Sequence, residues 1–431
     1  MKWFGRCPDC GAWSSATEAT TGVGAATPLH IAPLSEATGA LDRFSTGLKE
    51  VDRVVGGGLV KGEALLLAGE PGVGKSTLVL QLIGGLVERG QRSILVTGEE
   101  SLDQVALRAH RLNLPLDRLD AVAAFSLPSI VALSEHHRPD VLIVDSVQTL
   151  EHPELEQPAG SVTQVRECAA ELVRHAKRTG TVVILVGQVT KEGTIAGPKT
   201  LEHLVDAVVN LDGERGGTLR LLRASKNRFG SCEEVGVFLM GPRGLDPVGD
   251  PSAMFLADRR VGVTGSTVFP GIEGTRPLLV EIQALTTSSG SPQPRRVPIG
   301  LDARRLALLL GVLTERTGSK SFTASDVFVA AAGGFTVREP AVDLPLCIAL
   351  YSAVNSVAVD AGTVAVGEVG LAGEIRRVPA TERRLQEAAR LGFRTALAPR
   401  GVETVPDGLG VIVVSDLLEV FAHLERRRPA A

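Results

Sequence analysis

Continuous apolar runs recur along the first half of the chain. They are LLLAG at 65–69, SILVTG at 93–98, VLIVDS at 141–146 and TVVILVG at 181–187. Such runs predict strands that are buried on both faces, as in a parallel sheet. Helical patterns at about 75–89, 101–112 and 161–179 lie between or beside them. The alternation predicts an α/β fold with right-handed crossovers.

The pattern of residues changes at several places in the rest of the chain. Further strands are expected near 207–212, 218–224 and 234–240, and a break follows at about 241–260. Beyond the break, a second globular unit is expected, with a long polar loop at 286–300. Residues 15–40 are rich in Ser, Thr, Ala, Gly and Pro, which is typical of a linker. The expected parts are 1–14, the linker at 15–40, an α/β domain at 41–245 and a C-terminal domain at 260–431.

Composition narrows the class of protein without giving a function. The 431 residues are 44% hydrophobic and 22% charged with a net charge of −4, which suits a soluble globular protein and shows no global sign of nucleic-acid binding. The sequence has no signal peptide and no apolar run of about 18 residues, so a cytoplasmic location is expected. Cys168, Cys232 and Cys347 are far apart and are expected to be buried or inert thiols.

The sharpest local signal is GEPGVGKST at 69–77, which fits G-x-x-x-x-G-K-[ST] between a predicted strand and a predicted helix. Backbone N–H groups of such a loop surround phosphates at a helix N-terminus. Lys75 is expected to reach the β- and γ-phosphates, and Ser76 to hold Mg²⁺. The predicted ATP-binding residues are Gly69, Glu70, Pro71, Gly72, Val73, Gly74, Lys75, Ser76 and Thr77.

Polar residues at three other strand ends are candidates for the same site. Asp145 ends the run VLIVD, where a carboxylate would face Mg²⁺. Glu99 and Glu100 follow the run SILVT, and either of the two is a candidate general base. Gln188 ends the fourth strand and is a candidate sensor of the γ-phosphate. The simpler alternatives are a turn former, acids at a helix N-terminus and a loop amide.

A short basic element follows the predicted core strands. It consists of Lys226, Asn227, Arg228, Phe229 and Gly230, and we call it the KNRFG segment. Its composition alone allows contact with phosphate, contact with a neighbour's nucleotide, or an ordinary hairpin tip.

Together these elements resemble the bacterial RadA (Sms) family. The matching stretches are KWFGRCPDCGAW, FSTGLKEVDRVVGGGLVKGEALLLAGEPGVGKSTL, LVTGEES, VLIVDSVQTL, GQVTKEGTIAGPKTLEHLVDAVVNLDGE and SKNRFG, and the resemblance covers essentially the whole chain. It implies a RecA-like P-loop ATPase of homologous recombination and DNA repair that uses ATP and Mg²⁺. It also implies a hexameric ring that moves on single-stranded DNA, promotes branch migration and works with a RecA-type recombinase.

The resemblance also adds candidate DNA contacts. Lys191 and Lys199 fall in VTKEGTIAGPKT, the match to a mobile DNA-facing loop, and suit contact with the phosphate backbone. Lys226 and Arg228 are expected to reach the adjacent subunit's nucleotide, as an arginine finger does, or to bind DNA. Many members of the family have His at the position of Gln188, so this chain departs from the pattern there.

The C-terminal unit is similar to the Lon protease domain through GGFTVREPAVDLPLCIALYSAV and VAVGEVGLAGEIRRVPATERRLQEAARLGF. Lon chemistry needs a nucleophilic Ser and a Lys. These positions fall on Ala341 and Glu382, so we predict a scaffold without protease activity. Its arginines are expected on a DNA-binding face, in ring contacts or on a solvated helix face. They include Arg376, Arg377, Arg383, Arg384 and Arg390.

The first residues hold half of a zinc site. Cys7 and Cys10 form a Cys-x-x-Cys pair, whereas a tetrahedral site needs four ligands. The family has an earlier Cys-x-x-Cys pair before the matching KW, and this chain begins with Met1 just before it. We expect either that the native chain starts further upstream, which we favour, or that the two cysteines are free thiols or bridge zinc between chains.

Three alternatives stand beside the leading hypothesis of a DNA-dependent ATPase motor. A RecA-like signalling ATPase would lack the KNRFG and Lon-like combination, and an ATP-dependent protease would need the missing Ser and Lys. A DNA-binding scaffold would not hydrolyse ATP. The expected fold is a RecA-like α/β core and a Lon-protease-like α+β domain, preceded by a truncated zinc finger.

Overall fold

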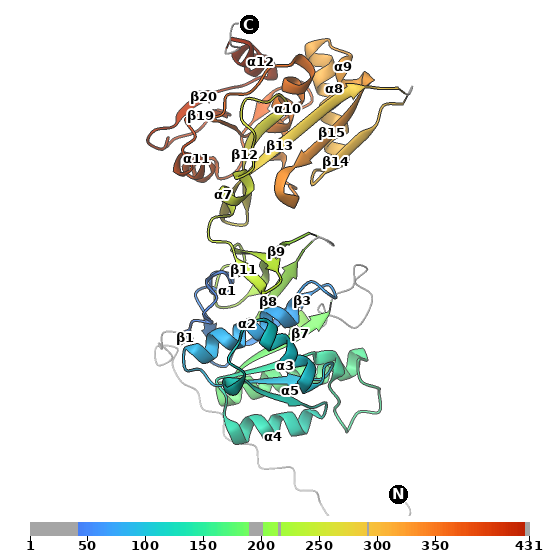
Figure 1. The fold of residues 1–431 in the computed structure, drawn as a ribbon, viewed down its shortest axis with the longest axis vertical. Helices are drawn as coiled ribbons and strands as arrows, with labels where there is room; N and C mark the ends of the chain where they lie inside the picture. Colours follow the sequence, from blue (N-terminus) through green and yellow to red (C-terminus); the bar gives the residue numbers. More distant parts are fainter. Residues whose placement is uncertain (1–41, 189–200, 214–216, 291–292, 427–431) are drawn as a thin grey trace, which may run out of the picture. The chain divides into compact units, whose positions relative to one another are not determined.

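The computed structural model describes residues 42–188, 201–213, 217–290 and 293–426. Its strands form two large sheets that follow one another in sequence, and two small pairs (Figure 1). The predicted zinc finger, the linker and the loop at 189–200 lie outside the described residues. The limits predicted for the domains therefore stay predictions.

The first sheet has nine strands in the order β11-β10-β9-β8-β3-β7-β6-β4-β5. They are β3 (Ala64–Gly69), β4 (Ser93–Thr97), β5 (Asp120–Ala123), β6 (Val141–Asp145), β7 (Val182–Gln188), β8 (Ala207–Asp212), β9 (Leu219–Asn227), β10 (Val235–Gly241) and β11 (Gly244–Pro247). The strands from β8 to β5 pair in parallel, and β9, β10 and β11 extend the sheet by antiparallel pairing. A separate small pair joins β1 (Arg43–Phe44) to β2 (Leu59–Val60).

Helices cover both faces of this sheet because successive strand residues point to opposite sides. Leu65 and Leu67 of β3 pack in one apolar cluster, and Leu66 packs in another on the opposite face. Three helices contribute to the first cluster, and two contribute to the second. They are α1 (Lys49–Val55), α2 (Lys75–Glu88) and α3 (Leu102–Arg111), against α4 (Leu127–His137) and α5 (Val162–Thr179). The predicted parallel α/β core is confirmed (Figure 1).

The four core strands and three helices expected from the sequence agree with the structure to within one residue at each end. The sequence did not predict β5 and α4, nor β11, nor the short elements β1, α1 and β2 that precede the core. β5 has the sequence DAVA and mostly exposed residues, so it gives no apolar run. Its pairing with β4, and not a local pattern, makes it a strand.

The second sheet has seven strands in the order β14-β15-β13-β12-β16-β19-β20. They are β12 (Ser266–Glu273), β13 (Arg276–Ser288), β14 (Arg296–Ile299), β15 (Ser325–Ala331), β16 (Thr363–Ala365), β19 (Thr395–Ala398) and β20 (Gly410–Val413). The remaining elements of this part are α7 (Pro251–Leu256), α8 (Ala303–Thr317), α9 (Ser321–Ala324), α10 (Asp343–Asn355), the pair β17 (Glu368–Val369) and β18 (Ile375–Arg376), α11 (Thr381–Arg390) and α12 (Leu417–Arg426). α8, α10 and α12 share the larger apolar cluster, and α11 belongs to a smaller one with β12 and β16.

The prediction of a polar loop at 286–300 is wrong in part. β13 continues to Ser288, and β14 occupies most of the loop's second half. Val297 of β14 pairs with Phe328 of β15, and Leu285 of β13 pairs with the same residue from the other side. The hydrogen bonds of a neighbouring strand thus order a segment whose own sequence is polar. No helix within the described ranges combines the length and apolar character needed to cross a membrane.

Candidate nucleotide site

The phosphate loop joins the end of β3 to the start of α2, at the carboxyl edge of the parallel strands. Gly72 and Gly74 have φ angles of 78° and 117°, which glycine adopts without the strain that a side chain would add. A Cβ atom on Gly74 would also lie 2.5 Å from the end of the Met240 side chain. The loop therefore reaches the N-terminus of α2 by a path that suits phosphate binding.

Lys75 is fixed inside this loop. Its Nζ donates hydrogen bonds to the carbonyl oxygens of Gly69 at 2.8 Å and Glu70 at 3.0 Å. The residue is only 7% exposed, and burial lowers its pKa while the charges of Asp145 and Glu99 raise it. A cation held at this place meets phosphate without first being ordered.

Asp145, at the end of β6, lies beside Ser76 of the loop. Burial raises the pKa of the Asp145 carboxyl, whereas a hydrogen bond from the Ser76 side chain lowers it. A carboxylate and a hydroxyl placed together at a phosphate loop are ligands that fit Mg²⁺. Bound there, Mg²⁺ would neutralise charge on the phosphates.

The structure separates the two glutamates that the sequence left as a pair. The Glu99 carboxylate accepts a hydrogen bond from Ser146 Oγ at 2.6 Å and from Gln188 Nε2 at 3.2 Å. Glu100 instead forms an ion pair with Arg108 of α3 at 2.5 Å. The charges of both glutamates act on Asp145, but only that of Glu99 also acts on Lys75, and the carboxylate of Glu100 is paired with Arg108.

The KNRFG segment occupies the opposite edge of the same sheet. Asn227 pairs with Ala207 at the start of β8, and Ala207 pairs with Leu65 near the start of β3. The phosphate loop begins after Gly69, at the other end of β3. At about 3.3 Å per residue, the two ends of this six-residue strand are roughly 16 Å apart. The structure therefore does not bring the KNRFG segment to the phosphate loop of its own chain.

The structure does not test every residue that the sequence suggested. Lys191, Lys199, Cys7 and Cys10 lie outside the described residues. Cys168 and Cys347 are buried as expected, and Cys232 is exposed. Within the described ranges, no group of three or more His, Cys, Asp or Glu side chains is arranged to hold a metal ion.

Three of the five arginines named in the C-terminal part are paired with carboxylates of the same chain. Arg384 is 2% exposed, and its guanidinium donates to Glu339 and to the carbonyl oxygens of Pro270 and Pro379. For this residue the expectation of a solvated or DNA-binding surface is wrong, because its guanidinium is buried and makes four hydrogen bonds within the domain. Two of the exposed arginines are also paired. They are Arg376 with Glu374, and Arg390 with Asp250 and Glu387.

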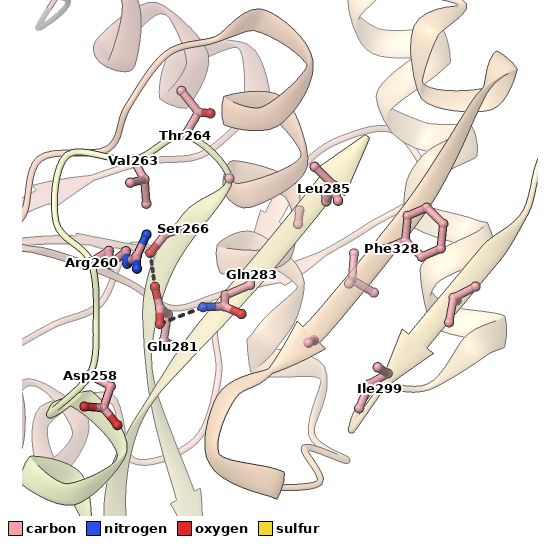
Figure 2. Close-up of a pocket in the computed structure, with 15 residues that line it drawn as sticks. Asp258, Arg260, Val263, Thr264, Ser266, Glu281, Gln283, Leu285, Ile299 and Phe328 are labelled. Carbon is pink, nitrogen blue, oxygen red and sulfur yellow. Dashed lines mark hydrogen bonds between the residues drawn. The ribbon is translucent and has the colours of Figure 1, made fainter. Parts of the chain in front are cut away.

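A pocket of about 470 Å³ lies on the second sheet, and sequence reasoning did not find it. Figure 2 shows Glu281 joined to Ser266 and Gln283 by hydrogen bonds, on one side of the pocket. Leu285, Phe328 and Ile299 line the other side, from three adjacent strands. The alternation of exposed residues in β13 and β14 was the available signal, but both segments overlapped the predicted loop.

Comparison with known proteins shows the family to which the chain belongs. The family model described as an AAA domain matches residues 32–194, and the one described as subunit ChlI of Mg-chelatase matches residues 321–401. A protein of Pseudomonas aeruginosa named DNA repair protein RadA is 46% identical over 98% of this chain and 96% of its own length. Proteins with the same name from Escherichia coli and Mycolicibacterium smegmatis are 44% and 40% identical, over 98% and 96% of this chain and 96% and 92% of their own lengths. With this identity along nearly its full length, the chain belongs to the RadA family.

Proposed function

We propose that the chain is a DNA-dependent ATPase of homologous recombination and DNA repair. It hydrolyses ATP with Mg²⁺, moves on single-stranded DNA and promotes branch migration of recombination intermediates. One observation supports this most: Lys75, Asp145 and Glu99 converge on a phosphate loop. That loop belongs to a chain that is 46% identical over 98% of its length to a protein named for DNA repair.

In this proposal each side chain has a separate task. Lys75 binds the β- and γ-phosphates, and Ser76 and Asp145 hold the metal ion. Glu99 accepts a proton from the attacking water, since its carboxylate is held by Ser146 and is not tied up in an ion pair as that of Glu100 is. Gln188 holds Glu99 and responds to the γ-phosphate at the end of β7.

The KNRFG segment acts on a neighbouring subunit. Its distance from the phosphate loop of its own chain favours a role in trans, in which Arg228 completes the adjacent nucleotide site as an arginine finger. Such an arrangement needs a closed assembly with one site per interface, and a hexameric ring fits this need. Because each site is completed only by a neighbour, the subunits of such a ring would hydrolyse ATP one after another.

DNA and a RecA-type recombinase are the proposed partners. The net charge of −4 requires any basic surface to be local. Lys191 and Lys199 supply two cations within ten residues, and they suit sequence-independent contact with a phosphate backbone.

The test is a D-loop extension assay with ATP, run together with ATP turnover on single-stranded DNA. Lys75→Ala is expected to lower turnover at least about 100-fold, because a preorganised charge at the phosphates is lost. Lys226→Ala is expected to abolish D-loop extension, because the change disrupts the KNRFG segment. Exposed Lys49→Ala, outside the site, is the matched control. Full extension activity in both the Lys75 and the Lys226 variants would refute the motor.

An ATP-dependent protease is the less favoured alternative. Ala341 is 2% exposed and offers a methyl group where Lon chemistry needs a hydroxyl. Glu382 accepts a hydrogen bond from the backbone N–H of Glu403 at 3.3 Å, and its charge is opposite to that of the required Lys. ATP-dependent cleavage of casein would revive this alternative.

A further inference from the structure

Contacts at the amino edge of the first sheet hold the KNRFG segment in place. Asp206 immediately precedes β8, and only 3% of its side chain is exposed. Its Oδ2 accepts hydrogen bonds from the Ala64 N–H at 3.0 Å and from Lys177 Nζ at 2.5 Å. Its Oδ1 lies 3.5 Å from Arg228 Nη1, and its backbone carbonyl accepts the Arg228 N–H at 3.1 Å. One residue thus links β3, α5 and the KNRFG segment.

The two cations of the segment are used differently. Lys226 Nζ donates to the carbonyl oxygens of Glu202 at 2.6 Å and Val205 at 2.8 Å, so its ammonium is bound to the chain just before Asp206. The Arg228 side chain is 57% exposed. Across the described ranges, its one ion pair is the long contact with Asp206. Lys226 therefore anchors the segment, and Arg228 is the cation that points outward.

Asp206 does not need Arg228 to balance its negative charge. Lys177 supplies a closer positive charge, and it also lies 5.6 Å from the centre of the Phe229 ring. The 3.5 Å contact leaves most N–H groups of the Arg228 guanidinium available to a second anion. An exposed arginine loses rotamer freedom when it binds, and a fixed buried charge beside it limits that freedom beforehand.

We propose that Asp206 is a positioning residue whose buried carboxylate directs Arg228 outward from the amino edge of the sheet. The proposal rests on the role of Arg228 in trans that is proposed above. The predicted consequence is that the loss of the Asp206 charge impairs the adjacent subunit's hydrolysis without weakening the chain's own phosphate loop. Asp206 touches neither nucleotide nor DNA in this scheme and acts only through Arg228.

The experiment compares Asp206→Asn, Arg228→Ala and the double variant in the full chain. ATP turnover is measured with a long oligothymidylate, and the affinity for a fluorescent ATP analogue is measured separately. Asp206→Asn is expected to lower turnover roughly 10-fold with unchanged analogue affinity, as loss of a supporting side chain commonly does. The double variant is expected to be no slower than Arg228→Ala, because in this scheme Asp206 affects turnover only through Arg228.

Glu63→Gln is the matched control. Glu63 is a buried carboxyl at the same edge of the sheet, and its hydrogen bond comes from the Val60 N–H. A general weakening of this edge would lower turnover in Glu63→Gln as much as in Asp206→Asn. Equal loss in the two variants therefore overturns the positioning role.

The remaining outcomes are also decisive. Normal turnover in Asp206→Asn with impaired Arg228→Ala refutes the positioning role and leaves the proposed function standing. Losses that multiply in the double variant refute it too, because they show two independent effects. Normal turnover in Arg228→Ala removes the role in trans, and the positioning role with it.

Asp206→Asn leaves Lys177 without its partner, so a second variant keeps the charges balanced. Asp206→Asn combined with Lys177→Met removes both members of the ion pair, a change that proteins tolerate better than the loss of one member. This variant still lacks the carboxylate that directs Arg228. The same 10-fold loss is expected from it, and full turnover in the folded variant overturns the proposal.

Discussion

The side-chain amide of Gln188 donates to both carboxylate oxygens of Glu99, at 3.2 and 3.4 Å. Glu99 follows β4 and Gln188 ends β7, two strands that are not neighbours because β6 lies between them. Ser146, just after β6, completes the group through its own hydrogen bond to Glu99. A carboxylate held from two strands has little freedom to turn away from the phosphate loop, and this restraint is what a base needs to act on a bound water.

Gln188→Ala should release one side of Glu99. We expect ATP turnover to fall about 10-fold while KM for ATP changes little, because the amide orients the base and does not bind the phosphates in the proposed scheme. Gln188→His should keep part of the activity, since a ring N–H can donate to the same carboxylate. Steady-state kinetics of the three proteins at one DNA concentration test this. A rise in KM with unchanged kcat would contradict the orienting role.

Glu99→Gln should abolish hydrolysis and preserve nucleotide binding. Loss of a general base typically lowers the rate 100- to 10,000-fold, or about 3–5 kcal/mol in activation free energy. Glu100→Gln is the matched control. Its side chain and that of Arg108 are 31% and 25% exposed, so the lost ion pair should cost less than about 1 kcal/mol. Single-turnover hydrolysis with a binding assay distinguishes the two, and a larger loss in Glu100→Gln would reverse the assignment.

Stability should depend on pH through Glu63. Burial, partly offset by the hydrogen bond from Val60, raises the pKa of its carboxyl from 4.5 to about 7. Between these values the folded protein keeps a proton that the unfolded chain releases, so stability falls as pH rises through the window. Above pH 7 the contribution is constant, at roughly 3 kcal/mol less than at low pH.

Glu63→Gln should remove this slope, because the amide does not titrate. Urea unfolding at pH 5, 6, 7 and 8 is the measurement, and the variant should gain on the wild type as pH rises. Glu154→Gln, at an exposed position, is the control and should follow the wild type. Parallel curves for wild type and Glu63→Gln would show that Glu63 titrates normally in the fold.

The core strands could be predicted because each of them carries its whole burial pattern in its own residues. Every residue of β3 is buried, so LLLAG identifies it without knowledge of its neighbours. β14 is different, because its four residues are ordered by pairing with β15. Phosphate-loop residues were also predictable, since their spacing follows from the chemistry of one continuous turn.

Relationships between distant side chains were not predictable in the same way. Glu99 and Glu100 are adjacent in sequence, and only the positions of Arg108 and Ser146 show that their carboxylates have different partners. Nothing in the sequence around Asp206 distinguishes it from other polar residues. Its importance comes from Lys177 and Arg228, which lie 29 and 22 residues away.

Arg384 gives the last prediction, because its burial contradicts the surface role expected for it. Its guanidinium makes two contacts with Glu339, and the ring of Phe269 lies 5.9 Å away. Arg384→Met should destabilise the C-terminal part by about 3 kcal/mol, since it leaves the half-buried Glu339 carboxylate without its ion-pair partner and with only the hydrogen bond from the Ile272 N–H. Arg384→Met with Glu339→Gln should recover part of the loss, whereas Arg383→Met at an exposed position should cost little. Hydrogen exchange of α11 amides measures each variant locally. Normal protection in Arg384→Met together with weakened DNA binding would restore the surface role.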